Sequence, residues 1–265
     1  MKAKVYDTKG KQVKDITLPD AFNEPIRTDL INRASLAILS SSYQAKGTFP
    51  RSGLQTTARY VGRRRAYHAL INRGMARLPR VLGPKGHIGE VRRVSHSRGG
   101  RIVHGPKTQK KLKEEINKKE KRKAFRSALS ATTITELVTK RGHKTEGIKT
   151  LPIILQDEIE NITKTKDMII TLKNLGLEKE LERTQEKRIR AGKGTMRGRK
   201  YKKKKGVLIV TGTNAKVYKA ARNIPGTDIC TAKELNTYHL APGGQPGRLT
   251  IYTESAIQEL QKRLE

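Results

Sequence analysis

Unmixed positive charge in two stretches is the sequence feature with the clearest chemical meaning. From 43 to 107, a stretch that we call the arm, the chain has 15 Lys or Arg against one acid, Glu90, and 10 of its 23 glycines. From 187 to 205, 11 of 19 residues are basic and none is acidic. Guanidinium groups grip phosphate oxygens and stack on bases, and glycine lets a phosphate approach the backbone. Both stretches are therefore expected to bind a polyanion.

The candidate binding side chains are mostly the basic residues of these two stretches. In the arm they are Arg51, Arg59, Arg63, Arg64, Arg65, Arg73, Arg77, Arg80, Lys85, Arg92, Arg93, Arg98, Arg101 and His104. In the second stretch they are Lys193, Arg197, Arg199, Lys200, Tyr201 and Lys202. A third basic run, "KKEKRK" at 118–123, includes a glutamate, and a solvated helix face explains it equally well.

The charge of the whole chain points to the class of partner. The 265 residues carry a formal net charge of +34, and bound phosphates would relieve the resulting self-repulsion. An acidic membrane surface is the rival partner, but the sequence has no apolar run near 18 residues and no basic amphipathic helix with a bulky aromatic face. RNA is favoured over DNA, because no DNA-binding signature is present and irregular basic arms suit the shaped cavities of folded RNA.

Two motifs resemble parts of nucleotide-binding loops. "AGKGT" at 191–195 lacks the Walker spacing and follows a charged helix instead of a strand. "VTGTNAK" at 210–216 follows a predicted strand and opens a predicted helix, but it lacks the G-x-G-x-x-G pattern. A tight turn in which Thr213 or Asn214 caps the helix is the favoured interpretation.

The remaining reactive residue types form no recognised catalytic or metal-binding pattern. The six histidines have no cysteine pair beside them and no H-x-x-x-H spacing, so no zinc site is expected. Asp157, Glu158 and Glu160 are expected to form a solvated acidic face. Cys230, the one cysteine, suits a reducing intracellular compartment and is expected to be a packed, inert thiol. The sequence thus predicts no catalytic residue, no metal and no cofactor, and "MKAKVYDTKG" at its start shows no secretory signal.

Short apolar strands alternate with helices near the end of the chain, which predicts a mainly parallel sheet covered on both faces. Strands are expected at 3–7, 13–18, 151–155, 206–210, 227–230 and 248–252. Helices are expected at 26–38, 108–130, 133–141, 165–174, 177–190, 214–223, 232–236 and 254–264. Thr108 is expected to cap the second helix, and Thr133 with Glu136 to form a capping box for the third, which Gly142 ends.

The arm lacks regular periodicity and interrupts these elements. We therefore expect an α/β fold, a three-layer αβα domain with a mainly parallel sheet, formed by residues 1–42 and 108–265 and interrupted by a long irregular basic loop, 43–107. The arm has too little apolar surface to offset the entropy of ordering it. It is expected to be mobile alone and ordered on RNA.

Several stretches resemble one known family. "RAGKGTMRGRKY" at 190–201, "ARNIPGTDI" at 221–229 and "LAPGGQPGRLTIYTESA" at 240–256 are similar to signature stretches of the large-subunit ribosomal protein family conventionally numbered four, in its archaeal and eukaryotic form. "ARLPRV" at 76–81 and "RSALSATT" at 126–133 also fit this family. The resemblance covers nearly the whole chain in the expected order.

The resemblance implies an αβα domain on the outer face of the large subunit and a loop that enters the large-subunit ribosomal RNA (rRNA). The tip of that loop, at about 63–85, would help to line the narrow part of the nascent-peptide exit tunnel. Arg73, Gly74 and Met75 are the tunnel-lining candidates. The chain ends at Glu265, soon after its last predicted helix, which favours the archaeal form.

The expected partners are large-subunit rRNA, neighbouring large-subunit proteins and the nascent peptide, in a cytoplasmic ribosome. Neither a membrane nor a second copy of the chain is expected as a partner. Two alternatives stay open at this point. One is an RNA-modifying or nucleotide-dependent enzyme that uses the α/β domain, and the other is a nonspecific DNA compactor.

Overall fold

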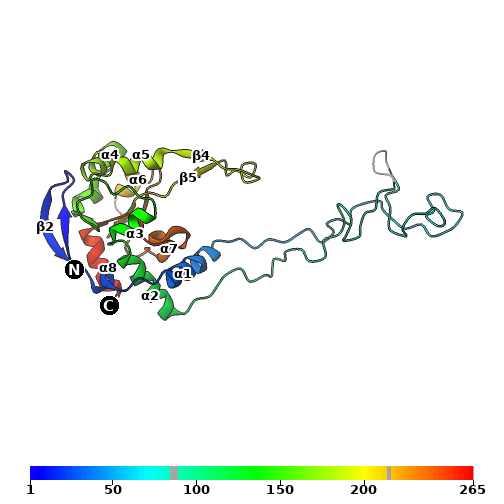
Figure 1. Cartoon of the computed structure of the whole chain (residues 1–265), viewed down its shortest axis with the longest axis horizontal. Coiled ribbons are helices and arrows are strands. Elements are labelled where there is room, and N and C mark those ends of the chain that lie inside the picture. Colours follow the sequence, from blue (N-terminus) through cyan, green and yellow to red (C-terminus); the bar gives the residue numbers. More distant parts are fainter. Residues whose placement is uncertain (84–88, 214–215, 265) are drawn as a thin grey trace. The chain divides into compact units, whose positions relative to one another are not determined.

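The computed structural model describes residues 1–83, 89–213 and 216–264. It divides the chain into two compact units (Figure 1). One unit joins Met1–Ser42 to Lys113–Glu265, and the other is Tyr43–Leu112. The chain thus leaves the first unit once and returns to it about 70 residues later.

The first unit is built on a six-stranded sheet with the order β2-β1-β3-β8-β6-β7. Every neighbouring pair is parallel except β1 and β2. This arrangement confirms the predicted mainly parallel sheet. The strands are β1 (Lys2–Tyr6), β2 (Gln12–Thr17), β3 (Ile153–Leu155), β6 (Leu208–Thr211), β7 (Asp228–Thr231) and β8 (Thr250–Thr253).

The central strands are buried along their whole length because both faces of the sheet are covered. Every residue of β3, β6 and β8 is buried. Successive side chains of a strand point to opposite faces, so Leu208 and Val210 enter one core and Ile209 enters the other.

Helices cover both faces of the sheet, which confirms the three-layer αβα arrangement. The core on one face contains Ile31, Leu129, Leu240 and Ile257, from the helices α1 (Thr28–Ser40), α2 (Lys118–Ser130), α7 (Thr237–Leu240) and α8 (Glu254–Leu264). The core on the other face contains Val138, Met168, Leu181 and Val217, from the helices α3 (Thr135–Lys140), α4 (Thr165–Asn174), α5 (Glu178–Gln185) and α6 (Val217–Ala221).

Several predicted helices are shorter than expected, two of them by several residues at one end. The helix expected from Thr108 begins at Lys118, because Leu112 and Ile116 are only half-buried and a helix needs an apolar face that packs. The helix expected over 177–190 ends at Gln185. Residues Lys187–Ile189 form a strand instead, since a partner strand further along the chain takes their backbone hydrogen bonds.

Two local predictions near the helix ends are wrong. Thr133 does not cap α3, because its hydroxyl donates to the carbonyl of Ser130 (2.8 Å) and the helix begins two residues later. The short helix expected at 232–236 is a turn, and α7 follows it. Asn236, at the end of that turn, caps α7, because its side chain accepts a hydrogen bond from the backbone of His239 (3.0 Å).

The second unit contains no helix and no regular strand among its described residues. Isolated bridges join Arg59 to Arg80 and Arg80 to Val91, so three segments of the arm cross at Arg80. The few buried apolar residues near this crossing are Ala58, Ala69, Leu70 and Val81. The absence of periodicity in the arm therefore reflects a segment with almost no core of its own.

The two ends of the arm lie side by side, because the backbone N–H of Thr48 donates to the carbonyl of Pro106 (3.2 Å). Deletion of residues 50–104 would join Phe49 to Gly105 and leave this pair as a tight turn. We expect the shortened chain to keep helical circular dichroism and a cooperative urea transition, because both cores lie in the first unit. Loss of that transition would contradict an independently folding α/β domain.

Candidate nucleic-acid interface

Three arginines of the arm hold its crossing together. Arg80 donates to the carbonyl of Gly89 (2.9 Å), and Arg93 donates to the carbonyl of Ala58 (3.1 Å). Arg92 donates to the carboxylate of Glu90 (2.6 Å). These guanidinium groups replace part of the missing core, which the charge pattern of the sequence did not indicate.

Most of the other predicted basic residues of the arm are free to bind a ligand. Their side chains are exposed and make no hydrogen bond or ion pair with any residue that the structure describes: Arg51, Arg59, Arg63, Arg64, Arg65, Arg73, Arg77, Arg98, Arg101 and His104. Lys85 lies outside the described residues. A unit with this many uncompensated charges of one sign repels itself and attracts a polyanion.

The three tunnel-lining candidates occupy one turn of the arm. Arg73, Gly74 and Met75 are all exposed. Gly74 has φ of +66°, a conformation that favours glycine. The turn thus presents one cation and one flexible apolar side chain, and its role stays a prediction.

The second basic stretch forms a feature that the sequence analysis missed, the hairpin of β4 (Lys187–Ile189) and β5 (Tyr201–Lys203). Lys187 lies opposite Lys203, and Arg188 lies opposite Lys202. Like charges that face each other across a strand pair destabilise it. The hairpin therefore exposes a repulsive surface, which a polyanion would neutralise.

The loop of the hairpin is compact although it is rich in glycine. The Thr195 hydroxyl donates to the carbonyl of Arg190 (2.5 Å), and the backbone N–H of Arg199 donates to the carbonyl of Gly194 (3.1 Å). The structure thus brings all six predicted residues of this stretch together on one exposed hairpin: Lys193, Arg197, Arg199, Lys200, Tyr201 and Lys202. "AGKGT" belongs to this loop and does not join a strand to a helix, so it is not a Walker loop.

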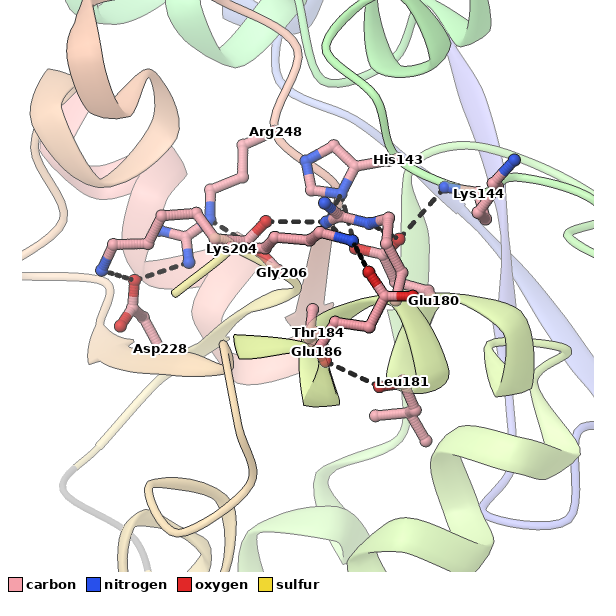
Figure 2. Close-up of polar contacts among 12 residues, drawn as sticks. His143, Lys144, Glu180, Leu181, Thr184, Glu186, Lys204, Gly206, Asp228 and Arg248 are labelled. Atoms are coloured by element: carbon pink, nitrogen blue, oxygen red, sulfur yellow. Dashed lines mark hydrogen bonds and ion pairs between the residues drawn. The ribbon is translucent and has the colours of Figure 1, made fainter. Parts of the chain in front are cut away.

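A buried carboxylate anchors the chain close to the base of the hairpin (Figure 2). Glu180 of α5 is fully buried and accepts hydrogen bonds from Arg183 (2.7 and 2.8 Å), from His143 Nδ1 (2.7 Å) and from the backbone of Lys144 (3.1 Å). Arg183 also donates to the carbonyl of Lys205 (2.8 Å), just after β5. Glu180 thereby orients the guanidinium group that holds this end of the hairpin.

The charge states within this network follow from burial and hydrogen bonding. Burial raises the pKa of Glu180, but the hydrogen bonds from Arg183, His143 and Lys144 outweigh it and bring the pKa to about 2. Burial lowers the pKa of His143, although Glu180 opposes that shift. The imidazole is therefore neutral at pH 7, and its Nδ1–H donates to an ionised carboxylate.

A second buried charge, the guanidinium of Arg248, holds Gly206, the residue after Lys205. Arg248 is 1% exposed and donates to the carbonyls of Gly206 and His239 (both 2.9 Å) and to the carboxylate of Asp228 (2.6 Å). The ammonium of Lys205 donates to the same carboxylate (2.8 Å). Two guanidinium groups from distant parts of the sequence thus fix consecutive carbonyls at the base of the hairpin.

Neither Glu180 nor Arg248 was predicted from the sequence. A signal for Glu180 exists, because it shares the helical spacing of the buried residues Leu177, Leu181 and Thr184. Arg248 lies two residues before β8, beside buried residues. A cation that is buried there needs a carboxylate partner. That partner, Asp228, lies 20 residues earlier in the chain, so local spacing did not reveal it.

The acidic cluster has a structural role at the carboxyl end of the sheet. Glu160 accepts hydrogen bonds from the backbone of Gly212 (2.9 Å) and from the hydroxyls of Thr253 (2.8 Å) and Ser255 (2.9 Å). Asp157 accepts from the backbone of Ser255 (2.9 Å). The prediction of a solvated acidic face is thus wrong for Glu160, which is half-buried and accepts from two βα turns, whereas Asp157 and Glu158 are exposed as expected.

The predicted cap and the lone thiol can be compared with the structure. Thr213 does not cap α6, which begins at Val217, and Asn214 lies outside the described residues. Cys230 is buried, which confirms the expected packed thiol, and burial raises its pKa to about 12.

Within the described residues, no group of three or more His, Cys, Asp or Glu side chains could hold a metal ion. None of the described helices is both long and apolar enough to cross a membrane.

Comparison with known proteins gives one consistent result. A family model described as "Ribosomal protein L4/L1 family" matches residues 16–263. A relative from Methanocaldococcus jannaschii, named large ribosomal subunit protein uL4, is 45% identical and covers all of both chains. Proteins of the same name from Sulfurisphaera tokodaii (46% identical, 100% of this chain and 95% of the relative) and Methanoculleus marisnigri (45% identical, 99% of both) are also similar.

The buried carboxylate at the base of the hairpin should make stability depend on pH. The folded pKa of Glu180, about 2, lies below its ordinary value of 4.5. Its ionised form therefore stabilises the fold above about pH 4.5, by on the order of 3 kcal/mol, and this contribution is lost as the pH falls toward 2. In Glu180→Gln we expect a lower unfolding free energy at pH 7 and a weaker pH dependence between pH 5 and 3.

Urea titrations at several pH values measure this effect. Glu182→Gln is the matched control, because Glu182 lies on the same helix and is exposed. It should keep the pH dependence of the unchanged protein. Equal acid sensitivity of the Glu180→Gln variant and the unchanged protein would show that Glu180 does not carry this stabilisation.

Proposed function

This chain belongs to the ribosomal protein L4/L1 family, and we propose from that membership how it works as a structural constituent of the large ribosomal subunit. Its relatives at 45–46% identity are archaeal proteins named as large-subunit components, and the chain has the archaeal form of the family. It resides in the ribosome in this role. Large-subunit rRNA is its main partner, and it contacts neighbouring ribosomal proteins without forming a homo-oligomer.

The exposed, unpaired arginines of the arm carry the proposal. Nine arginines of the arm make no hydrogen bond or ion pair through their side chains within the described part of the chain. An ordinary solvated surface mixes charges of both signs, whereas Glu90, the one acid of the arm, is engaged by Arg92. The arm therefore binds rRNA through phosphate contacts, which offset the entropy of ordering it.

The tip of the arm lies deepest in the RNA in this proposal. Arg63, Arg64 and Arg65 on one side, and Arg77 on the other, bind phosphates. The turn of Arg73, Gly74 and Met75 then lies at the wall of the exit tunnel, where the nascent peptide passes. The exposure of these residues supports this assignment.

A nucleotide-dependent enzyme is disfavoured by the chain's own carboxylate at the sheet edge. In open α/β sheets, ligands bind outside the carboxyl ends of the strands, often at backbone donors of a βα turn. Glu160 takes the backbone donor of Gly212 at this edge, together with two hydroxyl groups. A negatively charged phosphate would have to displace a negatively charged side chain from that position. The α/β domain therefore acts as a platform for the arm and the hairpin, without an enzymatic role.

RNA binding by the arm should depend steeply on salt. If roughly ten phosphates are contacted, affinity for a large-subunit rRNA fragment falls on the order of a thousandfold or more between 50 and 200 mM salt. Replacement of Arg63, Arg64 and Arg65 by Gln should lower the slope of log Kd against log salt by about two to three. Filter binding over a salt series measures this slope.

Matched controls separate this function from its alternatives. The variant with Lys2, Lys9 and Lys11 changed to Gln removes the same charge from exposed positions on the β1–β2 hairpin, and it should change the slope less. Equal slopes for the two triple variants would contradict a special role of the arm. Equal affinity for rRNA and for any DNA duplex at 150 mM salt would favour the DNA compactor.

A further inference from the structure

One face of the β4–β5 hairpin combines an apolar pair with positive charge. Ile189 and Tyr201 lie directly opposite each other in the strand register, so their side chains share one face. Lys187 and Lys203, two residues away on each strand, lie on the same face, whereas Arg188 and Lys202 point to the other. On this face, the apolar pair thus lies at the loop end of the strand ladder, and two cations lie at the other end.

This apolar pair is largely exposed and lies outside both cores of the domain. Ile189 is 71% exposed and Tyr201 is 48% exposed, and neither belongs to the two cores of the domain. The ammonium of Lys200 lies 5.6 Å from the centroid of the Tyr201 ring. Burial of these two side chains against a partner would remove their apolar surface from water, which is favourable.

Charge complementarity limits the chemical class of the partner. No acidic residue occurs between 187 and 205, so the partner must present a flat apolar surface with negative charge beside it. An A-form duplex offers phosphates but keeps its base faces stacked inside, and sequence-tolerant contacts to bases require unpaired nucleotides. An unpaired base supplies both a ring and an adjacent phosphate.

We propose that this face of the hairpin binds an unpaired base of RNA. The base stacks on Tyr201 and contacts Ile189, while Lys187, Lys200 and Lys203 neutralise the neighbouring phosphates. The proposal deepens the RNA-binding function above and rests on it, because it names the kind of RNA structure that the hairpin takes.

The anchoring of the hairpin base supports a defined geometry for this contact. The carbonyls of Lys205 and Gly206, just after β5, are held by Arg183 and Arg248, so this end of the hairpin is fixed on the domain. The two side chains of this pair offer a contact area of about the size of one base. An anionic membrane would require a larger apolar face than this pair provides.

The test compares two RNA stems that differ only by a single bulged nucleotide, with the full chain as the binder. Tyr201→Ser should raise the Kd for the bulged stem roughly tenfold and leave the Kd for the paired stem unchanged, because only the bulge offers a base to stack. Tyr201→Phe keeps the ring and should restore tight binding of the bulged stem. Lys202→Gln, on the opposite face, should weaken both stems by the same factor.

Each outcome bears on one claim. Equal effects of Tyr201→Ser on the two stems, or no effect on either, would overturn the stacking platform while RNA binding persists. Failure of the unchanged chain to bind either stem at low salt would instead count against the proposed function itself. A Tyr201-dependent preference for polyglutamate or anionic vesicles over both stems would assign the face to a different partner and overturn the proposal.

Discussion

Electrostatic repulsion within the chain is the constraint on which the rest of the structure depends. A net charge of +34 cannot be spread evenly over one compact domain without opposing its folding. Its charges are instead distributed unevenly between two parts of the chain. Most acids and both apolar cores lie in the α/β unit, whereas the least compensated cations lie in the arm and on the β4–β5 hairpin. A polyanion is therefore the partner that we propose for these two segments.

The α/β unit uses buried charges to hold the base of the β4–β5 hairpin. Buried Glu180 pairs with Arg183, and buried Arg248 pairs with Asp228. The two guanidinium groups in turn bind the carbonyls that follow β5. Glu160 likewise accepts hydrogen bonds at the carboxyl ends of the strands, from the backbone of Gly212 and the hydroxyl of Thr253. Buried ion pairs are costly to desolvate, and here they fix where an exposed basic segment leaves the domain.

The sequence predicted the parts of the fold that depend on local pattern. The alternation of apolar strands and helices gave the parallel sheet, and the loss of periodicity marked the arm. It did not predict features that depend on distant partners. The strand Lys187–Ile189 needs Tyr201–Lys203 to form, and its local composition is typical of a helix. Arg80, Arg92 and Arg93, which were expected to bind RNA like their neighbours, also donate hydrogen bonds within the arm.

The most direct test is a density map of the large ribosomal subunit that contains this chain. The account predicts that residues 63–80 are enclosed by rRNA, with the guanidinium groups of Arg63, Arg64 and Arg65 within hydrogen-bonding distance of phosphates. It also predicts that Met75 lies next to the exit tunnel. An arm that lies on the subunit surface, or that is enclosed by protein instead of RNA, would contradict it.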